Sequence, residues 1–195
     1  MTNRIHAHRR HVMQTLALAT LALCATAPTA MAQGAFPNKP ITLVVTYPPG
    51  GGADAMARLI APKMGEALGQ PVIIENKPGA SGQIGASAVA KAAPDGYTLM
   101  LDASSFSANP ALYPKLPYDS LKAFKPIGVV ALFPNVVLVN ANFPAKTIAE
   151  LTAVARKSKD AVSYASSGNG SAQHLAGALF ESAAKVDMVH VPYKG

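Results

Sequence analysis

The chain has 195 residues, half of them hydrophobic and 14% charged, which is enough for one ordinary domain and short for two full ones. Its formal net charge is +7, but the lysines are scattered, and the basic stripe with interleaved aromatics that nucleic-acid binding requires is missing from the sequence. A mildly basic protein that meets small anionic solutes fits this composition at least as well.

The first 32 residues have the pattern of a secretory signal peptide. A basic start with three arginines precedes an apolar run over residues 12–27 and the small-x-small sequence AMA at residues 30–32. We therefore predict cleavage after Ala32 and a periplasmic location, with a buried N-terminal helix as the alternative. The single cysteine, Cys24, lies inside this segment, and Leu23 before it disfavours lipidation. The processed chain would then carry neither thiol catalysis nor a cysteine-bound metal.

From residue 40 onward, β-rich runs alternate with alanine-rich helical stretches. This pattern predicts strands at residues 41–46, 72–75 and 97–101 and helices at residues 54–68 and 83–92. Gly69 is expected to close the first of these helices as a C-cap. Alternation of this kind implies β-α-β crossovers, so we expect an α/β fold with mainly parallel sheets and helices on both faces.

A second β-α series follows after residue 126. Two apolar runs, at residues 127–130 and 135–140, are interrupted by Phe133-Pro134 and predict a strand that bends from one body into another. Thr147 and Glu150 have the spacing of a capping box, which predicts a helix from there to about residue 157. Beyond it the pattern predicts a strand, a helix and a strand at residues 162–165, 172–184 and 188–191.

Loops rich in glycine and serine follow four of the predicted strands. The first, YPPGGGAD, is not a phosphate loop, because no Gly-Lys-Ser/Thr follows, and it lacks the G-x-G-x-x-G spacing of a dinucleotide site. Such loops at the carboxyl ends of parallel strands let a ligand approach the backbone, and the helix N-termini behind them favour negative charge. We expect a carboxylate or another small anion there.

The candidate ligand contacts are the small and polar residues of these loops. Asp54 is expected to cap the first helix and to belong to the anion site. The alternative is that it only caps the helix. The candidates in full are Gly50, Gly51, Gly52, Asp54, Ser81, Gly82, Ser104, Ser105, Ser166, Ser167, Gly168, Asn169, Gly170, Ser171 and His174.

A catalytic constellation is not apparent in the sequence. Beyond residue 32 there are two histidines, His174 and His190. The position of His174 fits a helix-capping or solvent-exposed role as well as it fits a ligand contact. No G-x-S-x-G elbow is present, and no His/Asp/Glu cluster has metal-ligand spacing. Glu75 and Asp102 could both lie at strand ends, but paired carboxylates would repel an anion. We predict a binding protein without cofactor or metal.

The alternative from another class is a secreted serine hydrolase. It would use Ser104, Ser166 or Ser171 with His174, and turnover of esters would reveal it.

Six segments in order carry a resemblance to a known family. The segments are YPPGGGADAMAR, VIIENKPGASGQIGA, APDGYTLML, LPYDSLKAFKPIG, YASSGNGSAQHLAG and VHVPYKG. Over residues 36–195 the chain resembles the solute-binding, Bug-type receptors of tripartite tricarboxylate transporters.

This resemblance implies a periplasmic-binding-protein-like (type II) fold of two lobes that close on a small solute. Residues 33–130 would form the first part of lobe one, and residues 131–195 the crossover and part of lobe two. The family's ligands are carboxylates such as citrate, dicarboxylates and amino-acid-like or aromatic acids. Tyr47 and Tyr193 would join the ligand contacts, and ordered water would mediate those of the first loop. The partners would be the permease subunits, the receptor itself being a monomer.

The chain is shorter than the family pattern. Members continue past the position of Gly195 to complete lobe two and return to lobe one, so we expect this chain to be the front portion of a longer receptor. A non-functional receptor fragment is the remaining alternative.

Overall fold

The computed structural model describes residues 35–193. The expected signal peptide, with Cys24 and the cleavage site after Ala32, lies outside the described residues. Within residues 35–193, no helix is long and apolar enough to cross a membrane.

The first sheet has three parallel strands in the order β2-β1-β3, with bounds Val72–Asn76, Ile41–Val45 and Thr98–Leu101. β1 lies in the middle, which explains its unbroken run of apolar residues, because a central parallel strand is covered on both faces. Leu43 and Val45 pack on Ala57 of the following helix, and Val44, which points the other way, is also buried.

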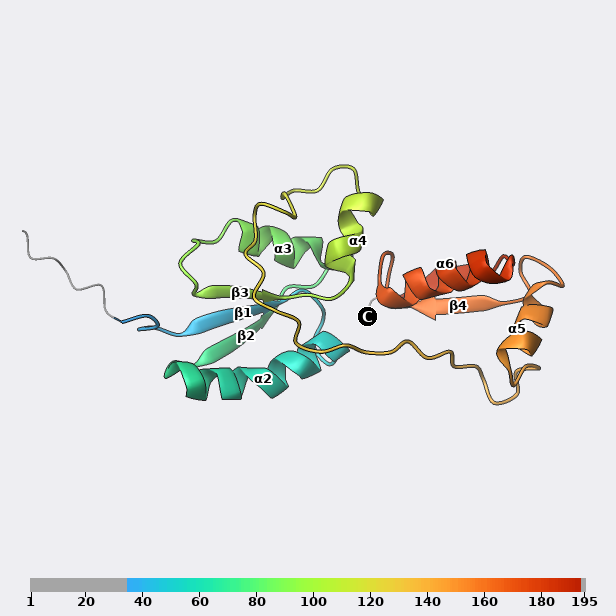
Figure 1. The fold of residues 1–195 in the computed structure, drawn as a ribbon, viewed down its shortest axis with the longest axis horizontal. Coiled ribbons are helices and arrows are strands. Elements are labelled where there is room, and N and C mark those ends of the chain that lie inside the picture. The colour runs from blue at the N-terminus through green and yellow to red at the C-terminus, as the bar shows by residue number, and fades with distance from the viewer. Residues whose placement is uncertain (1–34, 194–195) are drawn as a thin grey trace, which may run out of the picture. The chain divides into compact units, whose positions relative to one another are not determined.

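Helices α2 (Gly52–Leu68) and α3 (Gln83–Ala90) lie on opposite faces of the first sheet, as right-handed β-α-β crossovers require (Figure 1). Gly69 ends α2 in the left-handed conformation, with φ of 68°, which confirms the predicted C-cap. A single 3-10 turn, η1 (Ala80–Gly82), precedes α3, and α4 (Ser105–Leu112) follows β3.

The second sheet has two parallel strands, β4 (Ser163–Ser166) and β5 (Val189–Pro192), with helices α5 (Ile148–Ala155) and α6 (Ala172–Ala184). Its small core contains Leu151, Val162 and Val186. The predicted capping box is confirmed: the side chain of Thr147 accepts the N–H of Glu150, and the Glu150 carboxylate accepts the N–H of Thr147. The predicted elements on both sheets are therefore present, with ends shifted by one or two residues.

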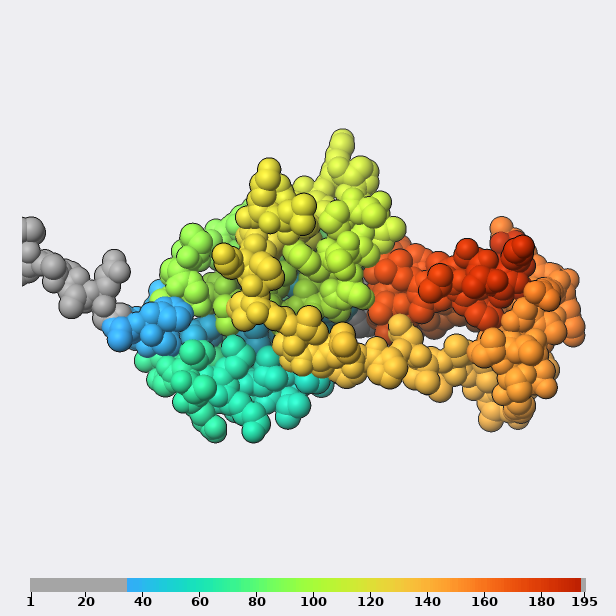
Figure 2. Space-filling model, in the orientation of Figure 1, coloured from blue at the N-terminus to red at the C-terminus, as the bar shows by residue number. Residues whose placement is uncertain are grey.

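The strand predicted over residues 127–140 is wrong. Residues 113–147 contain neither helix nor strand, and the apolar side chains there are exposed, Ile127 by 84%, Leu132 by 89% and Leu138 by 86%. Figure 2 shows this segment, in yellow, uncovered on the surface. An extended chain becomes a strand only when a neighbour pairs with its N–H and C=O groups, and none of the described residues does so.

Candidate anion-binding site

All five strands are parallel within their sheets, so their carboxyl ends bring the predicted loops to one edge of each sheet. The loops after β1, β2 and β3 gather at the edge of the first sheet. The loop after β4 and the chain after β5 gather at the edge of the second. This placement confirms the topology on which the predicted anion site depends.

The loop after β1 is held by the carboxylate of Asp54. Its oxygens accept hydrogen bonds from Gly50 N at 2.9 Å, from Arg58 Nε at 2.8 Å and Nη2 at 3.0 Å, and from Asn76 Nδ2 at 3.0 Å. Asn76 Nδ2 also donates to the carbonyl of Tyr47 at 3.0 Å. Asp54 is only 2% exposed, so its carboxylate fixes the loop from behind.

The predicted capping role of Asp54 is therefore realised in a different geometry. The N-cap of α2 is Gly51, without a side-chain cap, and Asp54 reaches back from the third helical position to the N–H of Gly50. The Arg58 guanidinium, with the N–H of Gly50 and the Asn76 amide, holds the pKa of Asp54 well below its usual range.

Asp54→Ala is expected to lower Tm by several degrees at pH 7, because Gly50, Arg58 and Asn76 all lose their acceptor. Since the folded pKa is depressed, the stabilisation is present above the unfolded value of about 3.9 and is lost as pH falls through the folded value. The Tm difference from the unsubstituted protein should therefore shrink between pH 5 and pH 2. Circular dichroism melts measure it, with the exposed Asp160→Asn as control. An equal difference at every pH would contradict this role.

Beside this loop lies a group of polar side chains that are buried or half-buried. Tyr47 Oη and Ser105 Oγ are 2.6 Å apart, and Ser105 is only 1% exposed, whereas Ser104 is exposed. Asp102 Oδ1 accepts the N–H of Ala103 at 2.7 Å and the Ser105 hydroxyl at 3.3 Å. Burial raises the pKa of the Asp102 carboxyl. Of the predicted contacts in this loop, Ser105 thus supports Tyr47, and Ser104 faces solvent.

The turn after β2 is built from residues in the left-handed region. Gly79, Ala80, Ser81 and Gly82 all have positive φ, from 49° to 123°, and such angles strain Ala80 and Ser81. The buried Asn109 Nδ2 donates to the Ser81 carbonyl at 2.9 Å. Ser81 Oγ donates to the carbonyl of Asn169 at 2.6 Å, which joins this turn to the loop after β4. A side chain at Gly82 would crowd Asp102, its Cβ lying 3.1 Å from Oδ2.

We call the loop after β4 the Gly168 loop (residues 167–171). Two of its N–H groups already donate to neighbouring side chains. Gly168 N donates to Ser166 Oγ at 3.1 Å, and Gly170 N donates to His174 Nδ1 at 3.0 Å. Both glycines have positive φ, 123° and 76°. The Ser171 side chain caps α6 by accepting the N–H of His174 at 3.3 Å.

Other donors of this loop remain available to a ligand. The N–H groups of Ser167, Asn169, Ala172 and Gln173 have no hydrogen-bond partner among the described residues. The last two belong to the first turn of α6, whose dipole favours an anion. Four N–H groups within seven residues can serve both oxygens of one carboxylate.

Tyr193 lies at the end of β5, beside the Gly168 loop. Its N–H donates to the Ser166 carbonyl at 2.9 Å, and its side chain is 64% exposed. A Cβ at Gly168 would lie 3.4 Å from the Tyr193 carbonyl oxygen, so the two segments are in contact. The ligand contacts predicted on the second sheet, Tyr193 and the Gly168 loop, are therefore neighbours.

Asn76, Asn109 and His190 are supporting residues that the sequence prediction missed. Asn76 ends the run VIIEN, and a polar residue at the end of an apolar strand was a usable signal. His190 Nε2 lies 2.6 Å from Ser166 Oγ, and its ring stacks on His174, with centroids 3.9 Å apart and planes at 6°. These side chains hold loops by contacts between distant parts of the sequence, which no local pattern indicates.

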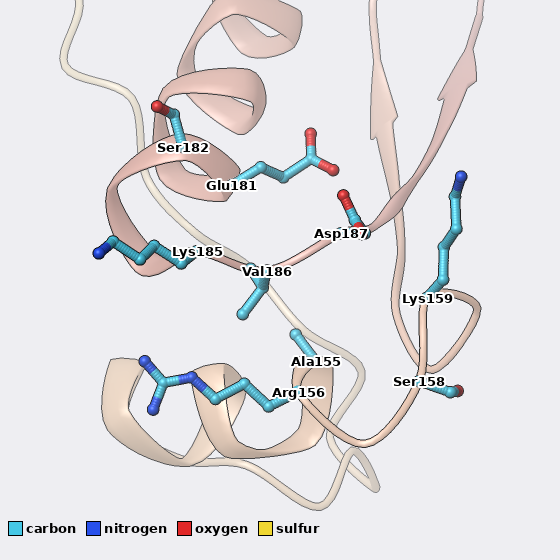
Figure 3. Close-up of a pocket in the computed structure, with 9 residues that line it drawn as sticks. All are labelled: Ala155, Arg156, Ser158, Lys159, Glu181, Ser182, Lys185, Val186 and Asp187. Atoms are coloured by element: carbon cyan, nitrogen blue, oxygen red, sulfur yellow. The ribbon is translucent and has the colours of Figure 1, made fainter.

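The second sheet also has an open hollow of about 450 Å³, away from these loops (Figure 3). It lies where α5 and α6 end and before β5 begins. Arg156, Lys159 and Lys185 line it together with Glu181 and Asp187. The hollow is at the opposite edge from the strand carboxyl ends and holds charges of both signs, so it does not match the predicted anion site. Among residues 35–193, no group of three His, Cys, Asp or Glu could hold a metal ion.

Several solved structures are similar to this chain. The periplasmic binding protein BugD is 37% identical with a TM-score of 0.70, and the match covers 82% of this chain and 54% of that one. Rpa4515 of Rhodopseudomonas palustris with adipate is 38% identical, TM-score 0.77, with 82% and 54% covered. MatC from Rhodopseudomonas palustris with bound malate is 38% identical, TM-score 0.74, with 82% and 55% covered. The fold is thus that of the periplasmic binding proteins, as predicted.

The family follows from the sequence match. The chain spans about half the length of the curated relatives that it matches. The family model described as tripartite tricarboxylate transporter family receptor, TctC, matches residues 56–195. With the parallel strands, the glycine and serine loops and these structural neighbours, the chain belongs to the tripartite tricarboxylate transporter receptor family.

Proposed function

We propose that the protein is a periplasmic receptor that captures a small dicarboxylate and delivers it unchanged to the permease subunits of a tripartite transporter. The observation that carries the proposal is the cluster of N–H groups at the Gly168 loop and the start of α6 that no described residue accepts. A carboxylate is the anion that matches them, because its two oxygens accept several N–H donors at once.

The nature of the ligand is supported by two neighbours. The solved relatives hold malate and adipate, both of which carry two carboxylates. A ligand with two carboxylates needs a second anion-receiving edge, and the first sheet offers the loop around Gly50 and the turn at Ser81. Asp54 and Ser105 act there as supports, while Gly51, Gly52, Ser81, Ser104 and the Tyr47 hydroxyl are the proposed contacts.

The organisation that goes with this function is also a proposal. Residues 1–32 would be removed as a signal peptide, residues 33–130 would belong to lobe one, and residues 131–195 would provide the crossover and part of lobe two. Closure of the lobes would follow ligand binding, because a ligand that touches both lobes favours the closed state. The receptor would act as a monomer.

A serine hydrolase is the second candidate, and one contact favours it. Ser166 Oγ and His190 Nε2 are 2.6 Å apart, the distance of a nucleophile and its base. Against it, Ser166 is only 6% exposed and its hydroxyl is engaged with Gly168, and no described carboxylate orients the other ring nitrogen of His190. For the predicted pairing with His174, its Nδ1 accepts the N–H of Gly170, and no hydrogen bond joins its ring to Ser104, Ser166 or Ser171 among the described residues.

Labelling with a serine-directed phosphonate decides between the two functions. A receptor should remain unlabelled and should not turn over an ester panel. Labelling of the unsubstituted protein that disappears in Ser166→Ala would establish the hydrolase.

Gly168→Val is expected to weaken malate binding at least tenfold. Gly168 has φ of 123°, which side chains rarely adopt, so valine would force the loop and its free N–H groups out of position. Titration calorimetry of the purified protein with malate and adipate measures the loss. Gly128→Val is the matched control, because Gly128 has no neighbour within 4 Å of a Cβ and its φ is not positive. Unchanged affinity in Gly168→Val would remove this loop from the site.

A further inference from the structure

We propose that His174 and His190 form a proton-sensitive latch on the Gly168 loop, in which two neutral rings hold the loop in its anion-receiving form and protonation releases it. The consequence for ligand capture rests on the proposed function, whereas the latch itself is a property of the loop and can be tested without ligand.

His174 holds the second half of the loop. Its Nδ1 accepts the N–H of Gly170 at 3.0 Å, and a ring nitrogen that accepts a hydrogen bond has no proton of its own. His174 is therefore neutral in this arrangement, with its proton on Nε2. Its place in the first turn of α6 disfavours a positive charge as well, because the N-terminal end of a helix is the positive end of its dipole.

His190 holds the first half of the loop through Ser166. Its Nε2 lies 2.6 Å from Ser166 Oγ, which in turn accepts the N–H of Gly168 at 3.1 Å. The Ser166 hydroxyl also lies 3.2 Å from the Gly168 carbonyl. The two histidines are thus positioning residues for the two glycines that shape the loop.

The two rings are stacked so closely that it is unfavourable for both to be protonated at the same time. Their centroids are 3.9 Å apart, and Tyr164 of β4 packs against His190 with centroids 5.0 Å apart. Two imidazolium ions at this distance repel each other. Burial, and to a lesser extent the neighbouring His174, hold the pKa of His190 below its usual value.

The other titratable groups around the pair do not offset this. Glu181 of α6 favours the charged form of His190, but its carboxylate already accepts the N–H of Met188 at 2.6 Å and the Tyr164 hydroxyl at 3.4 Å. Tyr164, whose pKa is raised, is neutral throughout the relevant range. The pair therefore favours the neutral state, and acid must break a loop contact to charge it.

The direction of the pH effect follows. A histidine whose folded pKa is depressed stabilises its fold above the unfolded value of about 6.5, and the stabilisation is lost as pH falls through the folded value. A proton on Nδ1 of His174 would face the N–H of Gly170, so that hydrogen bond is lost first. We expect the Gly168 loop to loosen below about pH 6.5.

The latch is tested by nuclear magnetic resonance titration of the ligand-free protein between pH 8 and pH 5. The Gly170 amide should shift and lose exchange protection as the pH falls from 8 to 5. His174→Asn keeps an acceptor at a similar distance and cannot be protonated, so its Gly170 amide should stay protected down to pH 5. His174→Ala should leave that amide unprotected at every pH. A Gly170 amide that stays protected down to pH 5 in the unsubstituted protein would overturn the latch.

A second variant tests the pairing of the rings. His190→Gln retains a side-chain hydrogen bond to Ser166 but removes the neighbouring imidazole, so the Gly170 amide should lose its protection at a higher pH than in the unsubstituted protein. Loss of protection at the same pH in both proteins would overturn the paired latch.

The link to capture is tested with malate as the probe, by calorimetry at pH 7.5 and pH 5.5. Affinity should fall about tenfold in the unsubstituted protein, and His174→Asn should abolish most of that fall. Because malate itself takes up protons in acid, the two proteins are compared at each pH. An equal fall in both would overturn the link. If neither malate nor adipate binds at any pH, the proposed function fails for these ligands, while the amide titration still decides the latch.

Discussion

Gly177→Ala is expected to destabilise the second sheet, although alanine is the better helix former. Gly177 lies in the middle of α6, where a Cβ would come within 2.2 Å of Tyr164 Cε2 and 2.6 Å of Cζ. Alanine in place of glycine gains up to ~1 kcal/mol in a helix interior. Overpacking of this kind costs about 1–3 kcal/mol, and Tyr164 cannot retreat without leaving its stack on His190. Gly177→Ala should therefore lower the free energy of unfolding by about 1–2 kcal/mol.

A double-mutant cycle with Tyr164→Ala tests whether the Tyr164 ring causes this destabilisation. Without the tyrosine ring the clash is gone, so adding Gly177→Ala should then stabilise the protein by up to ~1 kcal/mol. The reversal of sign is measured by urea unfolding of the four proteins. A Gly177→Ala protein that is as stable as the parent in the presence of Tyr164 would contradict the close packing of α6 on β4. Because the Tyr164 ring also stacks on His190, the loss of stability should be accompanied by shifts in the His190 ring resonances.

The second large effect is expected for Gly85→Ala, in the first sheet. A Cβ at this position in α3 would lie 2.9 Å from the carbonyl oxygen of Lys77, 2.9 Å from Thr46 Cγ2 and 3.3 Å from Thr46 Cα. Two of these atoms are backbone at the carboxyl ends of β1 and β2, where sheet hydrogen bonds hold them. The helix must therefore move, and we expect a loss of about 2–3 kcal/mol.

Gly52→Ala is the matched control, because it lies at the start of α2, has no neighbour within 4 Å of a Cβ, and its φ is not positive. It should be neutral or slightly stabilising. Both variants are compared by thermal and urea unfolding. If Gly85→Ala matched Gly52→Ala, α3 would not approach β1 as closely as described. A displaced α3 should also disturb the strained Ser81 turn that precedes it, so malate affinity should fall in Gly85→Ala under the proposed function.

Local patterns predicted the elements well where the pattern and the packing agree. The β1 run is continuously apolar because both of its faces are covered, and Gly69 was recognisable as a C-cap because a left-handed residue is needed there. The Thr147 capping box is local by nature, since both of its hydrogen bonds join residues three apart. The strand over residues 127–140 failed because a strand depends on a partner, which the local sequence does not contain.

The sequence by itself determined which loops could form an anion site. Parallel topology follows from the alternation of strands and helices, and it brings the loops after β1 to β5 to the carboxyl edges of their sheets. The glycines at 50, 168 and 170 were recognisable as loop formers, and the structure gives all three positive φ. Family membership was also readable from the ordered motifs, because they are spread along the chain from residue 47 to residue 195.

Only the tertiary structure decided what each loop residue does. Asp54 and Ser105 became buried supports, because Arg58, Asn76 and Tyr47 supply their partners. The N–H groups of Gly168 and Gly170 are occupied by the neighbouring side chains of Ser166 and His174, and folding adds His190, which lies against Ser166 from β5. The physical reason is that hydrogen bonds between side chains and loops depend on distances across the fold, whereas sequence patterns report only residues a few positions apart.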